Sequence, residues 1–152
     1  MIPEEEIMSE IKEMGYVTIK PRVERPSYYK LSDGTIVKAL VHINSIIADP
    51  RNPEGFNVNP TNLVSAFVPK EKRNPMGFQP QSQGEDLAQG MIEQDVDFEV
   101  LKEDFSVYEL SNNLILSVKT VVGQISKTKH YTKEGESVYL VNMNPIIKVK
   151  KA

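Results

Sequence analysis

The sequence predicts a mainly β protein in which a small five-strand unit occurs twice, after a single N-terminal α-helix. The first observation is an internal repeat, because residues 17–46 align with residues 96–125 at a constant offset of 79 without a gap. The identities are Val17/Val96, Glu24/Glu103, Ser27/Ser106, Tyr29/Tyr108, Leu31/Leu110, Ser32/Ser111, Ile36/Ile115 and Ile46/Ile125. Self-similarity at a fixed offset is typical of duplicated supersecondary units. We therefore predict a tandem duplication.

Alternation of apolar and polar residues is the second observation. Residues 17–20 and 96–100 both alternate, which is the period of a half-buried strand. Residues 28–31 and 35–47 are two further expected strands, and they flank a short polar turn at Ser32 to Gly34. The strand over 35–47 is too long to remain flat, so we expect it to bend.

Turn residues are the third observation. Asp33 and Gly34 supply the positive φ that a tight hairpin requires. Asn112 and Asn113 stand at the equivalent point of the second unit, and asparagine tolerates the left-handed region better than most side chains. Both units are therefore expected to contain the same hairpin.

A proline-rich loop and two closing strands complete each predicted unit. A register slip of three residues then places Phe56 opposite Val138. The closing strands are 56–58 and 63–68 in the first unit, and 138–141 and 146–149 in the second. Five strands in 50 to 60 residues suit a small barrel of the SH3 or OB kind, or half of a larger sandwich.

The predicted organisation is an N-terminal helix at 1–15, β unit 1 at 16–73, a linker at 74–94 and β unit 2 at 95–152. The linker is rich in Pro, Gly, Gln and Met and has no strand period. The sequence leaves open whether the units fold separately or pack as one domain. Joint packing would cover the exposed edges of a small sheet, so we expect the second unit to pack against the first.

The N-terminal helix has clear boundary signals. Pro3 stands in the first turn, Glu4 to Glu6 follow at the positive end of the helix dipole, and Gly15 can cap the C-terminus. Ile7, Ile11 and Met14 share one face. This apolar face either covers one end of a barrel or forms an interface with another subunit, and these three residues are the candidate partner interface.

Composition argues against several functional classes. The chain has no cysteine, which excludes disulfides, thiolate nucleophiles and cysteine-ligated metals. Its N-terminus does not resemble a signal peptide, and no apolar run approaches a membrane span, so we expect a cytoplasmic protein with no membrane partner. Neither G-x-x-x-x-G-K-[ST] nor G-x-G-x-x-G occurs. No catalytic residue, cofactor or metal is therefore predicted, although an enzyme is not formally ruled out.

The remaining titratable residues are explained without catalysis. His42 is expected to be a hydrogen-bonded histidine on a sheet face, and His130 a solvated loop residue. Asp95, Asp97 and Glu99 fall on one face of a strand, but three carboxylates in such a row span about 13 Å. One metal ion could reach two of them at most, so an edge strand in contact with solvent is the favoured interpretation.

A basic surface with tyrosines is an alternative functional signal. Residues 16–73 contain nine Lys or Arg against five Asp or Glu. Small barrels often present aromatic rings with basic rims to single-stranded nucleic acid. The candidate residues are Arg22, Arg25, Tyr28, Tyr29, Lys30 and Lys38. The overall net charge of −3 and the absence of an RNP-like motif weigh against this alternative.

We therefore predict a non-enzymatic structural or protein-interaction subunit that acts through sheet edges and the N-terminal helix. Self-association or a protein partner is expected, and nucleic-acid binding is the alternative. An exposed apolar patch that includes Ile7, Ile11 and Phe78 would favour assembly. A cleft with converging carboxylates or His42 would favour an enzyme.

Overall fold

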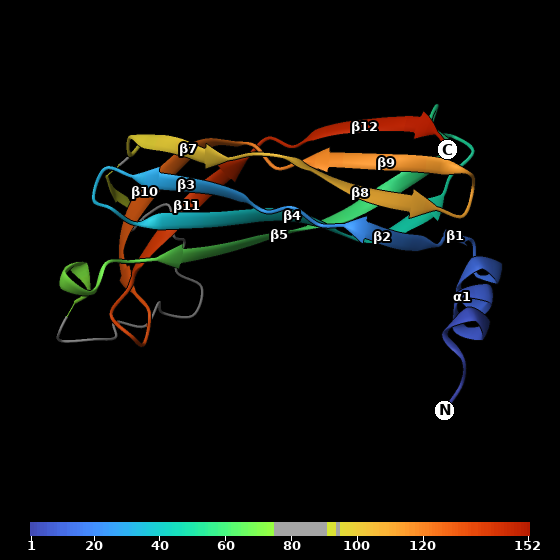
Figure 1. Cartoon of the computed structure of the whole chain (residues 1–152), viewed down its shortest axis with the longest axis horizontal. Helices are drawn as coiled ribbons and strands as arrows, with labels where there is room; N and C mark the ends of the chain where they lie inside the picture. The colour runs from blue at the N-terminus through green and yellow to red at the C-terminus, as the bar shows by residue number, and fades with distance from the viewer. Residues whose placement is uncertain (75–90, 94) are drawn as a thin grey trace.

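The structure is a computed structural model that describes residues 1–74, 91–93 and 95–152, and it confirms a mainly β fold with one N-terminal helix (Figure 1). The elements are α1 (Glu4–Glu13), β1 (Tyr16–Val17), β2 (Ile19–Val23), β3 (Ser27–Leu31), β4 (Ile36–Ala48), β5 (Phe56–Phe67), the 3-10 helix η1 (Lys70–Lys72), β6 (Met91–Glu93), β7 (Phe98–Lys102), β8 (Phe105–Leu110), β9 (Leu114–Lys119), β10 (Val122–Tyr131), β11 (Ser137–Met143) and β12 (Ile146–Lys151). No helix among these described residues is long and apolar enough to cross a membrane.

A long hairpin of β4 and β5 extends along the molecule (Figure 1). β4 covers 13 residues, and its register shifts between Ile43 and Ser45, which is the bend expected of so long a strand. The prediction of two short closing strands in the first unit is wrong, because β5 is continuous through Pro60. Proline is compatible with an edge strand, where one side of the backbone has no ladder partner.

The curled antiparallel sheets are shared between residues 16–73, called segment 1, and residues 95–152, called segment 2. Sheet A contains β1, β4, β3 and β7, with β5 on the other side of β4. Sheet B has the order β12-β9-β8-β2, and sheet C has the order β11-β10-β6. In sheets A and B one strand comes from the opposite segment: β7 pairs with β3, and β2 pairs with β8.

These two cross-segment pairings are equivalent at the offset of 79. Tyr29 is opposite Val100 in one ladder, and Tyr108 is opposite Pro21 in the other. The register shift beside Tyr29 recurs in the second ladder between Pro21 and Val23. The turn hydrogen bonds correspond as well, because Ser32 N–H donates to Asp97 O and Ser111 N–H donates to Thr18 O, both at 3.0 Å.

β5 returns along β4, and β11 returns along β10. The offset between β5 and β11 differs from the offset that the sequence suggested. Ile46 is paired with Val58, and its counterpart Ile125 is paired with Val141, so the second strand of the hairpin is displaced by 83 residues. The register slip is therefore four residues and not three. Phe56 corresponds to Tyr139, and both are buried. The loop in segment 2 is one residue longer than the alignment assumed.

Two hydrophobic cores result, and each takes side chains from both segments. The first core contains Val17, Val41, Ile43, Ile46 and Phe56 of segment 1 with Tyr108, Leu110, Leu116 and Val118 of segment 2. The second contains Tyr29, Leu31, Val37, Ala39 and Val68 of segment 1 with Val96, Val122, Ile125 and Tyr139 of segment 2. Apart from Val41 and Val68, each member has its counterpart in the other core. Neither segment encloses a core from its own side chains alone.

The predicted turns are confirmed by the backbone. Gly34 has φ 91° and Asn113 has φ 63°, and both follow the first strand of equivalent hairpins. Gly15 follows α1 with φ 97°. Within the predicted linker, residues 91–93 form the short strand β6, which pairs with β10. Residues 75–90, which include Phe78, and residue 94 lie outside the described residues.

Replacing Gly34 with valine should lower the free energy of unfolding by about 1–3 kcal/mol, because a β-branched residue is strained at positive φ. A Cβ atom at this position would meet Pro69 Cγ at 3.4 Å, an ordinary contact, so backbone strain is the cause. Urea denaturation measures the loss. The matched control is Asn113→Gly, which should cost little because glycine readily adopts the same conformation. Equal stability of Gly34→Val and the wild type would contradict the turn assignment.

Candidate functional site

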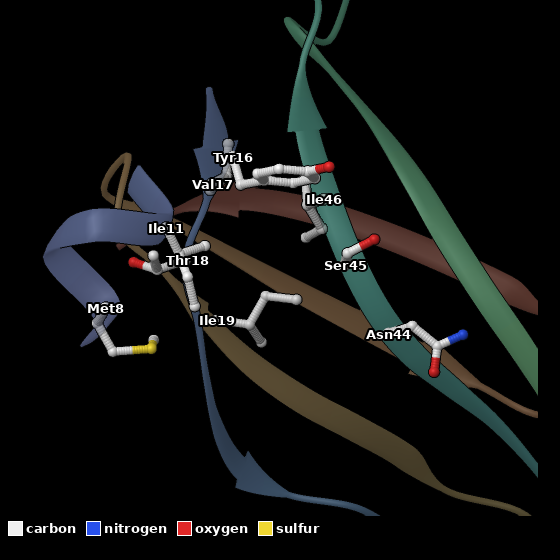
Figure 2. A pocket seen from close by; sticks show the side chains of 9 residues that line it. All are labelled: Met8, Ile11, Tyr16, Val17, Thr18, Ile19, Asn44, Ser45 and Ile46. Carbon is white, nitrogen blue, oxygen red and sulfur yellow. The ribbon is translucent and has the colours of Figure 1, made fainter. Parts of the chain in front are cut away.

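The predicted partner interface on α1 is largely open to solvent. α1 has no buried residue, Ile7 is 43% exposed, and Met14, just past the helix, is 69% exposed. Ile11 is half-buried and lies with Met8 against a pocket of about 160 Å³ that is otherwise lined by β1, the start of β2 and β4 (Figure 2). The structure therefore separates the three residues: Ile11 faces the protein, whereas Ile7 and Met14 leave apolar surface exposed.

Open strand edges provide a second apolar surface. β5 pairs with β4 alone, β7 with β3 alone, and β12 with β9 alone among the described strands. Each of these edge strands carries large apolar side chains that are exposed: Leu63, Val64 and Phe67 on β5, Val100 and Leu101 on β7, and Ile146 and Ile147 on β12. Exposed apolar residues on unpaired edges are the features that native sheets usually avoid or cover.

Two buried tyrosines join the segments through reciprocal hydrogen bonds. Tyr29 of segment 1 donates its hydroxyl to Glu103 Oε2 at 2.5 Å, and Tyr108 of segment 2 donates to Glu24 Oε2 at 2.8 Å. Both rings are completely buried. The Tyr29 hydroxyl also accepts a hydrogen bond from Val122 N–H at 3.0 Å. All four polar residues belong to the identities of the internal alignment, so these identities mark the junction between the segments.

Burial disfavours the ionised form of both tyrosines. It raises the pKa of Tyr29 to about 12, with a further contribution from the hydrogen bond to Glu103. The pKa of Tyr108 is raised for the same reasons, first by burial and then by Glu24. The two hydroxyls are therefore neutral donors throughout the physiological range.

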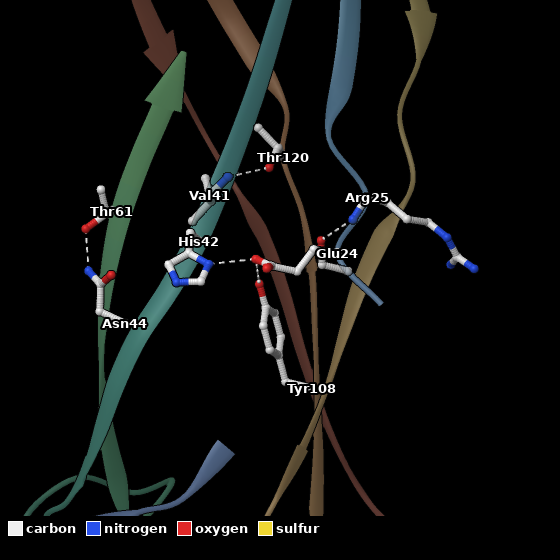
Figure 3. A network of polar contacts seen from close by, with 9 residues as sticks. Glu24, Arg25, Val41, His42, Asn44, Thr61, Tyr108 and Thr120 are labelled. Atoms are coloured by element: carbon white, nitrogen blue, oxygen red, sulfur yellow. Dashed lines mark hydrogen bonds and ion pairs between the residues drawn. The ribbon is translucent and has the colours of Figure 1, made fainter. Parts of the chain in front are cut away.

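Only one of the two tyrosine–glutamate pairs, Tyr108 with Glu24, has a histidine beside it. His42 Nδ1 lies 2.7 Å from Glu24 Oε2, the same oxygen that accepts from Tyr108 (Figure 3). Burial acts to raise the pKa of Glu24, but the hydrogen bonds from His42 and Tyr108 and the charge of His42 hold it below its ordinary value. The sequence predicted a hydrogen-bonded sheet-face histidine, and this geometry confirms it. The counterpart of His42 is Val121, so the fold does not require a histidine here.

The prediction for His130 is wrong. His130 belongs to β10 and is only 4% exposed, whereas a solvated loop position was expected. The surrounding lysines suggested a loop, but β10 continues through Tyr131 and places alternate side chains in the interior. Among the described residues, no group of three His, Cys, Asp or Glu side chains is arranged to hold a metal ion.

The residues of the predicted nucleic-acid face do not gather as a single set. Tyr29 is buried in the core and cannot stack on a base, so it is removed from the set. Arg25 is engaged with segment 2: its N–H donates to Ser106 Oγ at 2.8 Å, and its guanidinium donates to Phe105 O at 3.2 Å. Arg22 lies in β2, and its side chain is outside the described part of the structure.

Tyr28, Lys30 and Lys38 do lie together on the outer face of sheet A. Tyr28 is opposite Lys38 across the β3–β4 ladder, and Lys30 follows two residues later on β3. The structure adds Lys102, which is opposite Tyr28 across the β3–β7 ladder. Lys102 was missed because β7 comes from the other segment. The internal alignment shows which residue of segment 1 corresponds to Lys102. It does not show that β7 pairs with a strand of segment 1.

Comparisons of the chain with protein-family models, with curated proteins and with solved structures find no match.

Replacing Tyr108 with phenylalanine should lower the free energy of unfolding by about 1.5–3 kcal/mol, because Glu24 loses a charge-assisted hydrogen bond from a fully buried tyrosine. His42→Val, which installs the counterpart residue, should cost less than about 1 kcal/mol because this pair is partly exposed. Chemical denaturation of the two variants tests the ranking. A larger loss for His42→Val would show that the histidine, and not the tyrosine, holds the junction.

Alkaline pH should weaken the fold through Tyr29. Its pKa rises on folding from about 10 to about 12, so its contribution is complete below pH 10 and is lost as the pH rises toward 12. Tyr29→Phe should therefore show a smaller loss of stability than the wild type over this interval, and Tyr16→Phe, an exposed control, should follow the wild type. Denaturation midpoints at pH 9, 10 and 11 measure the difference. Parallel curves for Tyr29→Phe and wild type would contradict the assignment.

Proposed function

We propose that the protein is a non-enzymatic assembly subunit that associates with further copies of itself through open sheet edges and the N-terminal helix. The observation that carries the proposal is the concentration of exposed apolar side chains on β5, β7 and β12, together with a helix that buries none of its residues. Contiguous exposed apolar surface in a folded chain commonly marks an interface. Strand edges add backbone donors and acceptors that another edge can pair with.

The repeated pairings and the two equivalent cores support a further element of the proposal. We propose that segments 1 and 2 are copies of one duplicated unit. Strand exchange then ties the copies into a single body, in which each core needs both segments. A rigid body with several open edges suits a structural role better than a catalytic one. The Glu24–His42–Tyr108 cluster is explained by its junction role and needs no reaction.

The test is light scattering coupled to size-exclusion chromatography of untagged protein. We expect the wild type to form a defined oligomer, and Ile7→Asp with Met14→Asp to lower its mass, because two charges would be placed on the exposed apolar surface of α1 and the residue that follows it. Phe67→Asp tests the β5 edge in the same way. A wild-type monomer at all concentrations would overturn self-association.

The matched control is Ser9→Asp with Lys12→Gln, which makes the same change in net charge on the opposite face of α1. It should leave the oligomeric mass unchanged. Thermal unfolding of each variant separates interface loss from instability. An unchanged mass for Ile7→Asp with Met14→Asp, together with reduced stability for Ile11→Asp, would assign α1 the role of covering β1, β2 and β4.

A further inference from the structure

The outer face of sheet A carries an aromatic ring between two lysines from different strands. Tyr28 on β3 has Lys38 of β4 as its partner on one side and Lys102 of β7 on the other. Lys102 belongs to segment 2, and it reaches this place through the register shift in β7, where two residues oppose one. We call Lys38, Tyr28 and Lys102 the basic row.

The Tyr28 ring is available for contact. It is half-buried, and within the described residues it has no aromatic or cation–π partner. A useful contrast exists on sheet B, where Lys119 Nζ and Lys148 Nζ lie 5.3 and 5.0 Å from the centroid of the Phe105 ring. There the lysines already cover the aromatic face, whereas the face of Tyr28 is left for a ligand.

The fold itself does not require the basic row. At the offset of 79, Tyr28 corresponds to Val107, Lys38 to Ser117, and Lys102 to Val23. These three residues form the same pairings on sheet B without a charge or an aromatic ring. Uncharged residues without an aromatic ring therefore serve equally well at these three structural positions.

Neighbouring side chains extend the surface along the sheet. Lys30 is exposed beside the row, although Glu99 opposes it across the β3–β7 ladder. Phe67, which is 54% exposed, is opposite Ile36 on the same face. Strand spacing and rise place Phe67 roughly 12 Å from Tyr28. A second aromatic ring is thus available on the same face.

We propose that the outer face of sheet A binds single-stranded nucleic acid, with a base stacked on Tyr28 and the flanking phosphates on Lys38 and Lys102. This site goes beyond the proposed assembly role: it shares Phe67 with the β5 edge, but Tyr28, Lys38 and Lys102 belong to none of the surfaces proposed for assembly. An acidic protein would also satisfy the lysines, but it would leave the half-buried Tyr28 ring without an aromatic partner. Base stacking on an aromatic side chain, with lysines for the backbone, accounts for both features.

Fluorescence anisotropy with a labelled 20-nucleotide oligo-dT tests the site in the full chain. The wild type should bind in 50 mM salt and weaken as salt rises. Tyr28→Val should reduce affinity by at least about fivefold. Lys38→Ser with Lys102→Val should reduce it further, and should lower the slope of log affinity against log salt by about 1.4. These substitutions install the counterpart residues of sheet B, so the fold should be retained, which thermal unfolding verifies.

The matched control is Lys119→Ser with Lys148→Ser, which removes two charges from beside the ring on sheet B and should change affinity less than twofold. An equal loss in this control would show that net charge alone drives binding, and would overturn the site. Absence of wild-type binding would overturn it as well. Equal competition by poly-glutamate, or equal binding to a 20-base-pair duplex, would replace single-stranded nucleic acid by a general polyanion surface.

Discussion

Exchange of one strand between the two segments is the constraint on which the rest of the structure depends. β7 completes the sheet of segment 1, and β2 completes the sheet of segment 2. Each exchange point carries a buried tyrosine whose hydroxyl requires a carboxylate from the other segment. A segment alone would expose a half-core and leave a polar group unpaired, and both outcomes are costly. Folding of the two segments is therefore expected to be one cooperative event.

Local features of the fold could be predicted from the sequence because their causes are local. Gly34 and Asn113 mark their turns through backbone preference, and the N-terminal helix is bounded by its own cap residues. Exchange of β2 and β7 could not be predicted, because a strand's period shows that it pairs without showing its partner. The strands predicted at 56–58 and 63–68 are one strand, because an edge position tolerates Pro60 within it.

The candidate site residues likewise divide into those that local sequence predicts and those whose position depends on which strands pair. Tyr29 was assigned to a nucleic-acid face because it is aromatic and lies near lysines, but its burial depends on a ladder with β7. The alignment already contained a usable signal: Tyr29 is identical to Tyr108, and its partner Glu103 is identical to Glu24. A pair of residues that recurs in both segments serves the junction they share. His130 gave no such signal, since its neighbours are polar on both sides.

Differences between counterpart positions therefore carry information about function that identities do not. A residue that is identical in both segments can be explained by the architecture that the segments share. A charged or aromatic residue that only one segment has at a given position needs a further explanation. His42 opposite Val121 is one such difference, and the Glu24 carboxylate accounts for it locally. The basic row is the other: Tyr28 lies half-buried between two lysines, and within the described residues its ring has no aromatic or cation–π partner that would account for it. Because one lysine comes from each segment, that surface exists only once strand exchange is complete. The architecture that removes Tyr29 from the surface is the same one that brings Lys102 to Tyr28.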